Sequence, residues 1–189
     1  MTTNVSLDSE EGKGRLLECI GGHHATKVMQ VWEQQSGRTF CGFQTLACMI
    51  NSVEQTRVKD VELFRMMMEK SPDIEIDEST VLKEGITLDE FIDVARIITS
   101  TNLATSRVTI RQIHCNDNKD SIKRSLIVML SDRSHTRIAC NYHMSTAGQE
   151  PYGGHFSPLV AFHEQSDSFL ILDVWPDTAP FWVKWELLW

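Results

Sequence analysis

The chain has 189 residues, of which 41% are hydrophobic and 23% are charged, and its formal net charge at pH 7 is −8. A chain of this length suits one domain, spanning residues 1–189, with a sizeable core. The acidic balance argues against nucleic acid or an anionic membrane as a partner, because neither is attracted to a negative surface, and it favours small-molecule substrates.

The cysteine usage indicates a reducing, cytoplasmic compartment. Five cysteines, at positions 19, 41, 48, 115 and 140, show no paired spacing, which argues against a disulfide framework or a zinc finger. The N-terminal segment MTTNVSLDSEEGK is acidic where a secretory signal is basic, and no run of about eighteen apolar residues follows. We therefore expect neither export nor membrane insertion.

Helical periodicity dominates the first hundred residues. Ser9 reads as the N-cap of the first helix, and Thr87 with Glu90 forms a capping-box pair at the start of a later one. The predicted helices cover residues 9–20, 25–33, 41–51, 59–70 and 85–100. Between the last two, residues 71–83 are predicted to form a solvated loop.

The second half changes to strand-like patterns. Residues 116–124 are predicted as a short helix or turn, and 164–168 as the turn of a hairpin. The predicted strands cover residues 107–110, 126–130, 138–142, 155–163 and 169–174. Helices followed by strands predict an α+β fold with an antiparallel sheet.

Cys41 lies in the stretch QQSGRTFCGFQTLACMIN, at the first position of a predicted helix. Unpaired N–H groups and aligned peptide dipoles at a helix start stabilise a thiolate, and the thiolate is the nucleophilic form of cysteine. The alternative is a buried cysteine that packs as a small hydrophobe. Cys41 is therefore a candidate nucleophile whose interpretation depends on its partners.

Two later residues supply such partners. His155 follows a glycine pair at the start of an apolar run, and Asp173 ends the run FLILDV. A cysteine at a helix start, then a histidine, then a group that orients the imidazole is the chain order of papain-like enzymes. We expect His155 and Asp173 on successive strands of one hairpin, where cross-strand neighbours lie about 5 Å apart.

The remaining histidines do not suggest a metal site. His163 shares the strand face of His155 but lies beside the predicted turn, so it is interpreted as a surface residue. The others have no partners at ligand spacing; they are the histidines at 23, 24, 114, 135 and 143. We expect no bound metal.

Gln35 lies six residues before Cys41. A side-chain amide at such a position can donate to a developing oxyanion together with the N–H of Cys41. Gln34 is a competing candidate, and a solvated loop glutamine is the simpler interpretation of either residue.

The motifs FCGF, KEGITLDEF, GGHFSPL, LILDV and FWVKWELLW together resemble the catalytic domain of phytochelatin synthases, a family of the papain-like cysteine peptidase clan that uses glutathione. The resemblance runs from about Ser9 to Trp189 and is greatest to short bacterial members. It implies a papain-like fold in which the nucleophile helix packs on a C-terminal antiparallel sheet.

The resemblance also implies roles for individual residues. Cys41 would be the acylated nucleophile, and His155 would be the general base and acid. Asp173 would orient His155, and Gln35 would donate to the oxyanion. Asn141 and Gly154 match positions that hold the γ-glutamylcysteine part of the substrate.

The implied reaction is acyl transfer from glutathione, with a thioester on Cys41 that passes to a second glutathione, giving a phytochelatin, or to water. Cadmium and zinc would enter as glutathione thiolates in the substrate and not as tightly bound cofactors. A homodimer is one assembly that we consider for this protein.

The sequence departs from the family after Val174, where Trp175 to Pro180 replace a segment that usually carries an arginine and a lysine. Met144 or Ser145 stands where the family often has a basic residue, and the ending at Trp189 suggests either truncation at the C-terminus or a more open site. Loss of basic groups weakens carboxylate recognition, because arginine pairs with both oxygens. Alternatives are a papain-like peptidase or amidase for another small substrate, and a non-catalytic thiol- or metal-binding module.

Overall fold

The structure is a computed structural model, and it describes residues 4–70, 76–101, 109–113, 116, 118–133, 135–145, 148–150 and 153–189. The helices in these residues are α1 (Glu10–Glu18), α2 (Gly22–Met29), α3 (Cys41–Glu54), α4 (Asp60–Lys70), α5 (Glu78–Glu84), α6 (Leu88–Thr99), α7 (Lys119–Ser131) and α8 (Trp185–Leu188). The strands are β1 (Val5–Ser6), β2 (Ile138–His143), β3 (Gly154–His163), β4 (Ser168–Ile171) and β5 (Phe181–Lys184).

The strands form one antiparallel sheet in the order β1-β5-β4-β3-β2. β3 is its longest strand, and every residue of β3 except the first is buried. Helices α1, α2, α3 and α7 all contact β3. Because β3 is enclosed in this way, its sequence reads as an apolar run instead of alternating with polar residues.

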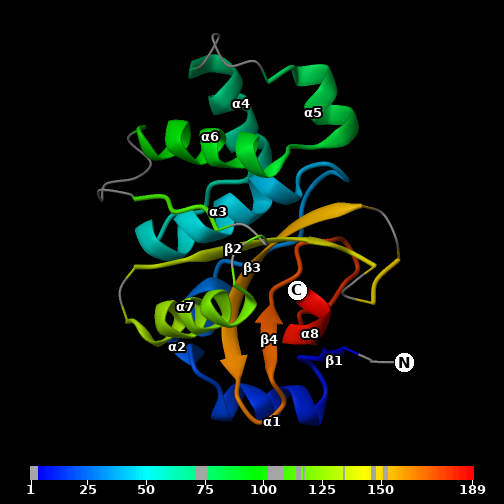
Figure 1. Cartoon of the computed structure of the whole chain (residues 1–189). Helices are drawn as coiled ribbons and strands as arrows, with labels where there is room; N and C mark the ends of the chain where they lie inside the picture. The colour runs from blue at the N-terminus through cyan, green and yellow to red at the C-terminus, as the bar shows by residue number, and fades with distance from the viewer. Residues whose placement is uncertain are drawn as a thin grey trace.

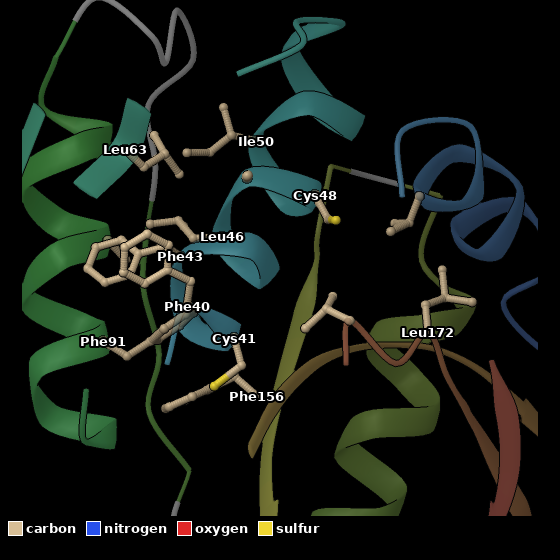
Figure 2. Close-up of a cluster of buried hydrophobic side chains, with 14 of the residues drawn as sticks. Phe40, Cys41, Phe43, Leu46, Cys48, Ile50, Leu63, Phe91, Phe156 and Leu172 are labelled. Atoms are coloured by element: carbon tan, nitrogen blue, oxygen red, sulfur yellow. The ribbon is translucent and has the colours of Figure 1, made fainter. Parts of the chain in front are cut away.

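Helix α3 lies between the sheet and a helical layer (Figure 1). It contacts β2 and β3 on one side and α4 and α6 on the other, so nearly all of its residues are buried. Phe91 of α6 stacks on Phe156 of β3, with ring centroids 4.7 Å apart. Figure 2 shows this pair beside Cys41, at the end of α3 that meets the sheet. The nucleophile candidate therefore lies where the two parts of the fold join.

The α+β class with an antiparallel sheet is confirmed, and so are the predicted helix caps. Ser9 Oγ accepts a hydrogen bond from Gly12 N at 3.0 Å. Thr87 and Glu90 make both bonds of the capping box, at 2.6 and 3.3 Å. These signals succeed because each bond joins residues only three positions apart.

The predicted strand at 126–130 is wrong, because these residues belong to α7. Asn118 caps α7 by accepting from Ser121 N at 3.0 Å. Ile122, Leu126 and Leu130 are buried at four-residue spacing, whereas Val128 is 68% exposed. A short continuous apolar run has no period that separates a strand from a helix, and here the helix face packs on the sheet.

Other boundaries also differ from the predictions. Residues 78–84 form α5, capped by Asp77, in place of the predicted loop, and residues 71–75 lie outside the described part. Helix α2 starts at Gly22 and not at residue 25, because Gly21 adopts a left-handed conformation with φ of 91° at its N-cap. Residues 109 and 110 form no strand, and 107 and 108 lie outside the described residues. Helix α7 contains most of the segment 116–124 that was predicted as a short helix or turn.

The C-terminal region pairs differently from the prediction. β4 ends at Ile171, two residues before Asp173, so the predicted strand 169–174 is too long. β5 and the short β1 were not predicted; they pair with each other and extend the sheet. No helix in the described part of the chain has both the length and the apolar character to span a bilayer.

The interpretation of His163 as a surface residue is wrong. Its exposed fraction is 6%, and its ring packs near Trp182, with centroids 6.1 Å apart. His163 Nδ1 accepts from Ser166 N at 3.3 Å. The turn that follows folds back over the ring, so proximity to a turn did not mean exposure.

Gly12 of α1 is expected to be intolerant of a side chain. A Cβ at this position would lie 2.0 Å from the carbonyl oxygen of Ser6 and 2.8 Å from Leu7 Cα, and both belong to the backbone. We expect Gly12→Ala to lower the free energy of unfolding by about 3 kcal/mol. Gly14→Ala in the same helix meets nothing within 4 Å and should raise that free energy by up to about 1 kcal/mol. Chemical denaturation of both variants checks this, and equal effects would contradict it.

Candidate active site

Cys41 is the first residue of α3 and is 9% exposed. The preceding residue, Phe40, has φ of −95° and ψ of 14°, and no side chain among the described residues caps the helix. The N–H groups of the first turn are therefore not occupied by a capping side chain. This end of α3 can stabilise negative charge on sulfur or on a substrate oxygen.

His155 lies second in β3 and is 1% exposed. Its Nε2–H donates to Asp173 Oδ1 at 2.8 Å. The ring also meets the rings of Tyr142 and Trp175 edge-on, with centroids 5.6 and 5.8 Å away. The imidazole therefore contacts two aromatic rings, and its Nε2 is hydrogen-bonded to a carboxylate.

The environment of His155 favours the imidazolium. Burial lowers the pKa of His155, but hydrogen bonds to Asp173 and to Cys41, with the charges of these two groups, raise the pKa overall to about 9. At neutral pH the ring therefore carries a proton. A protonated imidazole between a cysteine and a carboxylate is the arrangement that a cysteine acyl-transfer reaction needs.

Asp173 is completely buried and accepts several hydrogen bonds. Besides His155, its Oδ1 accepts from Trp175 N at 2.9 Å and from Ser157 Oγ at 3.4 Å. Its Oδ2 accepts from Gln149 Nε2. Contrary to the expectation of paired strand positions, Asp173 follows β4 and reaches His155 from the connection toward β5.

The chain just before α3 is hydrogen-bonded to the chain around Asp173. The indole N–H of Trp32 lies 3.2 Å from the carbonyl oxygens of both Leu172 and Asp173. Gln35 N donates to the carbonyl of Val174 at 2.8 Å. These bonds bring the chain ahead of Cys41 next to the chain around Asp173.

Gln35 is 4% exposed, but its amide is engaged with its own loop. Its Nε2 donates to the carbonyls of Gly37 at 2.7 Å and Arg38 at 3.0 Å. Its Oε1 is buried and has no partner among the described residues. Gln34, the competing candidate, is exposed and donates to the carbonyl of Thr178 at 3.2 Å. Of the two glutamines, Gln35 is the buried one.

Asn141 and Gly154 lie next to the Tyr142 and His155 pair on β2 and β3. Both are exposed, and a Cβ on Gly154 would be 3.9 Å from Asn141 Oδ1. Because neighbouring strand residues point to opposite faces, Asn141 and Gly154 belong to one face of the two strands, and the side chains of Tyr142 and His155 belong to the other.

The two positions where a basic residue is expected near Asn141 are occupied differently. Met144 is buried, with an exposed fraction of 3%. Ser145 is exposed, and its Oγ lies 2.7 Å from His143 Nδ1. Neither residue can supply the positive charge that the family resemblance leads one to expect.

Three neighbours of the histidine and aspartate were not identified from the sequence. They are Tyr142, Gln149 and Ser157. Burial, followed by the charge of Asp173, raises the pKa of Tyr142 well above its ordinary value. Trp175 was noted only as a departure from the family, and its contact with His155 depends on the tertiary fold. The sequence signal for Ser157 was its position two residues after His155, because residues two apart in a strand point to the same face.

A cavity of about 620 Å³ lies beside the site, between α3, α6, α7 and β2. Its lining is largely apolar and includes Phe91 and Asn141, but neither Cys41 nor His155. Among the described residues, no group of three His, Cys, Asp or Glu side chains is arranged to hold a metal ion.

The chain matches the family model of phytochelatin synthase over residues 1–189. It is 26% identical to glutathione γ-glutamylcysteinyltransferase 3 of Lotus japonicus, over 98% of this chain and 38% of that protein. It is 26% identical to the glutathione γ-glutamylcysteinyltransferase of Schizosaccharomyces pombe, over 97% of this chain and 44% of that protein. For glutathione γ-glutamylcysteinyltransferase 1 of Triticum aestivum the identity is 25%, over 98% of this chain and 36% of that protein.

The chain thus spans less than half the length of the curated relatives that it matches. The family match, in contrast, extends over all of it and includes the stretches that carry Cys41, His155 and Asp173. On this match the chain belongs to the phytochelatin synthase family, whose catalytic domain has the papain-like fold.

Proposed function

We propose that this protein is a cysteine acyltransferase that cleaves glutathione at its Cys-Gly bond and passes the γ-glutamylcysteinyl group to a second glutathione or to water. The observation that carries the proposal is the buried His155 of β3, which is hydrogen-bonded to Asp173 and lies against Cys41, the first residue of α3. The family membership and the names of the relatives support glutathione as the substrate.

In the acylation step, Cys41 Sγ attacks the carbonyl carbon of the Cys-Gly peptide bond. A C–S bond forms, and the carbonyl oxygen becomes negative. His155 then donates its proton to the glycine nitrogen, the C–N bond breaks, and glycine leaves with its amine restored. The product on the enzyme is a γ-glutamylcysteinyl thioester.

The N-terminus of α3 stabilises the oxyanion, through the N–H of Cys41. Gln35 is the second candidate donor. Its Nε2 is bonded to the carbonyls of Gly37 and Arg38, so it can serve the oxyanion only if substrate binding turns one hydrogen away from that loop.

In the second step, an amine or a water molecule attacks the thioester carbon. His155 accepts the proton of the attacking group, the C–S bond breaks, and Cys41 is regenerated. Attack by the amine of glutathione gives a phytochelatin, whereas attack by water gives γ-glutamylcysteine. On this proposal Asn141 and Gly154, which are exposed on β2 and β3, contact the γ-glutamylcysteine part.

Cadmium or zinc would enter the reaction as glutathione thiolate complexes, as part of the substrate. This chemistry belongs to a reducing compartment such as the cytoplasm, where glutathione thiols persist.

An amidase for another small substrate is the second candidate. It is favoured by the absence of arginine and lysine between Trp175 and Pro180 and by the apolar cavity that reaches Asn141. Glutathione has no large apolar group to fill such a cavity. An amide with an apolar part would use the same Cys41 and His155 chemistry.

The deciding experiment incubates the protein with glutathione, with and without cadmium, and separates the products by mass spectrometry. Phytochelatin would establish transfer, and glycine with γ-glutamylcysteine alone would establish hydrolysis. Absence of any product that depends on Cys41 would reject glutathione as the substrate and favour the amidase or a binding module.

The pH dependence follows from the raised pKa of His155. We expect kcat/KM to fall as the pH rises through about 9, because the imidazolium then loses the proton that glycine needs. The stabilisation from this raised pKa is fully present below the ordinary value of 6.5 and is lost as the pH rises through about 9. A pH series of initial rates, with denaturant unfolding in the same buffers, measures both effects. A rate that stays constant from pH 8 to 10 would contradict the assignment.

A further inference from the structure

The two oxygens of Asp173 are supported very differently. Oδ1 accepts from His155, Trp175 and Ser157, at distances from 2.8 to 3.4 Å. Within the described part of the chain, Oδ2 accepts from one donor, the Nε2 of Gln149. Rotation of the carboxylate about its Cβ–Cγ bond moves both oxygens, so the bond from Gln149 to Oδ2 adds a restraint on the side of the carboxylate that faces away from His155.

Gln149 belongs to the connection between β2 and β3. Its N–H donates to the carbonyl of Met144 at 3.0 Å, and Met144 N donates to Gly153 O at 3.0 Å. Met144 is buried, so this part of the connection is anchored in the protein. The connection starts just after the strand that carries Asn141 and ends at Gly154.

The side chain of Gln149 is not satisfied by its own loop. Its Oε1 is buried and lacks a hydrogen-bond partner among the described residues. A buried amide oxygen without a partner costs about 1–3 kcal/mol, so a purely structural glutamine here would be a poor choice. Such unsatisfied groups are uncommon in native proteins and call for an explanation.

We propose that Gln149 is a positioning residue: its bond to Oδ2 helps to hold the carboxylate of Asp173 with Oδ1 facing His155. The alignment of Asp173 with His155 therefore depends on the β2–β3 connection, to which Gln149 belongs. The expected loss of glutathione cleavage in a Gln149 variant rests on the proposed function, whereas the expected change in the titration of His155 does not.

Gln149→Met tests this directly, because methionine has a similar length but donates no hydrogen bond. The matched control is Gln112→Met, which removes a glutamine-to-aspartate bond of 2.9 Å to Asp89; Gln112 borders the apolar cavity, which glutathione has no apolar group to fill, and bonds Asp89 instead of Asp173. We expect Gln149→Met to lower kcat for glutathione cleavage by about tenfold or more, with little change in KM, because small misplacements of a catalytic group are costly. Gln112→Met should leave both constants unchanged.

A second measurement needs no substrate. His155 can be titrated by following the NMR signals of its imidazole nitrogens. We expect its pKa to be lower in Gln149→Met than the value of about 9 in the wild type, and to be unchanged in Gln112→Met. The direction follows because a turned carboxylate weakens the bond that raises the pKa. The other groups on this ring are Cys41 and the rings of Tyr142 and Trp175, which both variants retain.

The two readouts separate the hypotheses. If the wild-type protein does not cleave glutathione, the proposed function fails, while the titration still decides the role of Gln149. An unchanged titration in Gln149→Met, with or without a lower melting temperature, would show a merely structural residue and overturn the proposal.

Discussion

Cys41→Ala is expected to abolish glycine release from glutathione, with a loss on the order of 10⁶-fold, as for removal of the nucleophile in other acyl-transfer enzymes. His155 and Asp173 cannot form the thioester in its place, because they serve only proton transfer and orientation in the proposed reaction. The fold should persist, since the substitution removes one sulfur atom at the edge of the core. Mass spectrometry of products and of the acylated protein measures the effect.

Cys48→Ala is the matched control for this experiment. Cys48 lies on the same helix, is fully buried, and has a pKa raised by burial to about 11. Such a thiol is unreactive, so its loss should leave glycine release intact. Glycine release by Cys41→Ala at the rate of Cys48→Ala would show that Cys41 is not the nucleophile and would overturn the mechanism.

Replacement of Asp173 should produce the second largest effect. Asp173→Ala removes the acceptor of His155, and it also removes the acceptor that Trp175 N, Ser157 Oγ and Gln149 Nε2 share. We expect kcat/KM to fall by about 10³-fold or more, because the imidazole loses both its orientation and the charge that keeps it protonated. Stability should also fall, by about 1–3 kcal/mol for each donor that remains unsatisfied.

Asp173→Asn separates orientation from charge. An amide oxygen can still accept from His155 Nε2, but the negative charge that raises the pKa of His155 is removed. The new amide nitrogen would face Gln149, whose unpartnered Oε1 can accept from it if the Gln149 amide turns over. We therefore expect a smaller loss than for Asp173→Ala and a decline of kcat/KM that begins at a lower pH.

The control for both substitutions is Asp89→Asn, because Asp89 also accepts from a glutamine but lies outside the site. Initial rates and unfolding midpoints of the three variants are the measurements. If kcat/KM of Asp173→Asn declines at the same high pH as kcat/KM of the wild type, Asp173 does not set the protonation of His155.

The local signals in the sequence were sufficient for much of the helical half. Ser9 and the Thr87 with Glu90 pair mark helix starts through bonds between residues three positions apart. Cys41 at the start of α3 follows from the change from a loop composition to a helical stripe. Such features depend on contiguous residues, so they are readable without the fold.

The strand half was less readable, because pairing and burial decide it. The apolar run at 126–130 became part of α7, and the buried His163 was expected on the surface. β5 depends on pairing with β1 and β4, from opposite ends of the chain, and no local pattern specifies that pairing.

The sequence by itself determined the family, the fold class and the order of Cys41, His155 and Asp173, because these reside in motifs and in residue types. Only the tertiary structure decided the contacts that give these residues their chemistry. Asp173 reaches His155 from beyond the end of β4, Trp175 packs on the imidazole, and Gln149 bonds the second carboxylate oxygen. These contacts join segments that meet only when the chain is packed, so their physical origin is the fold as a whole and not any single stretch of sequence.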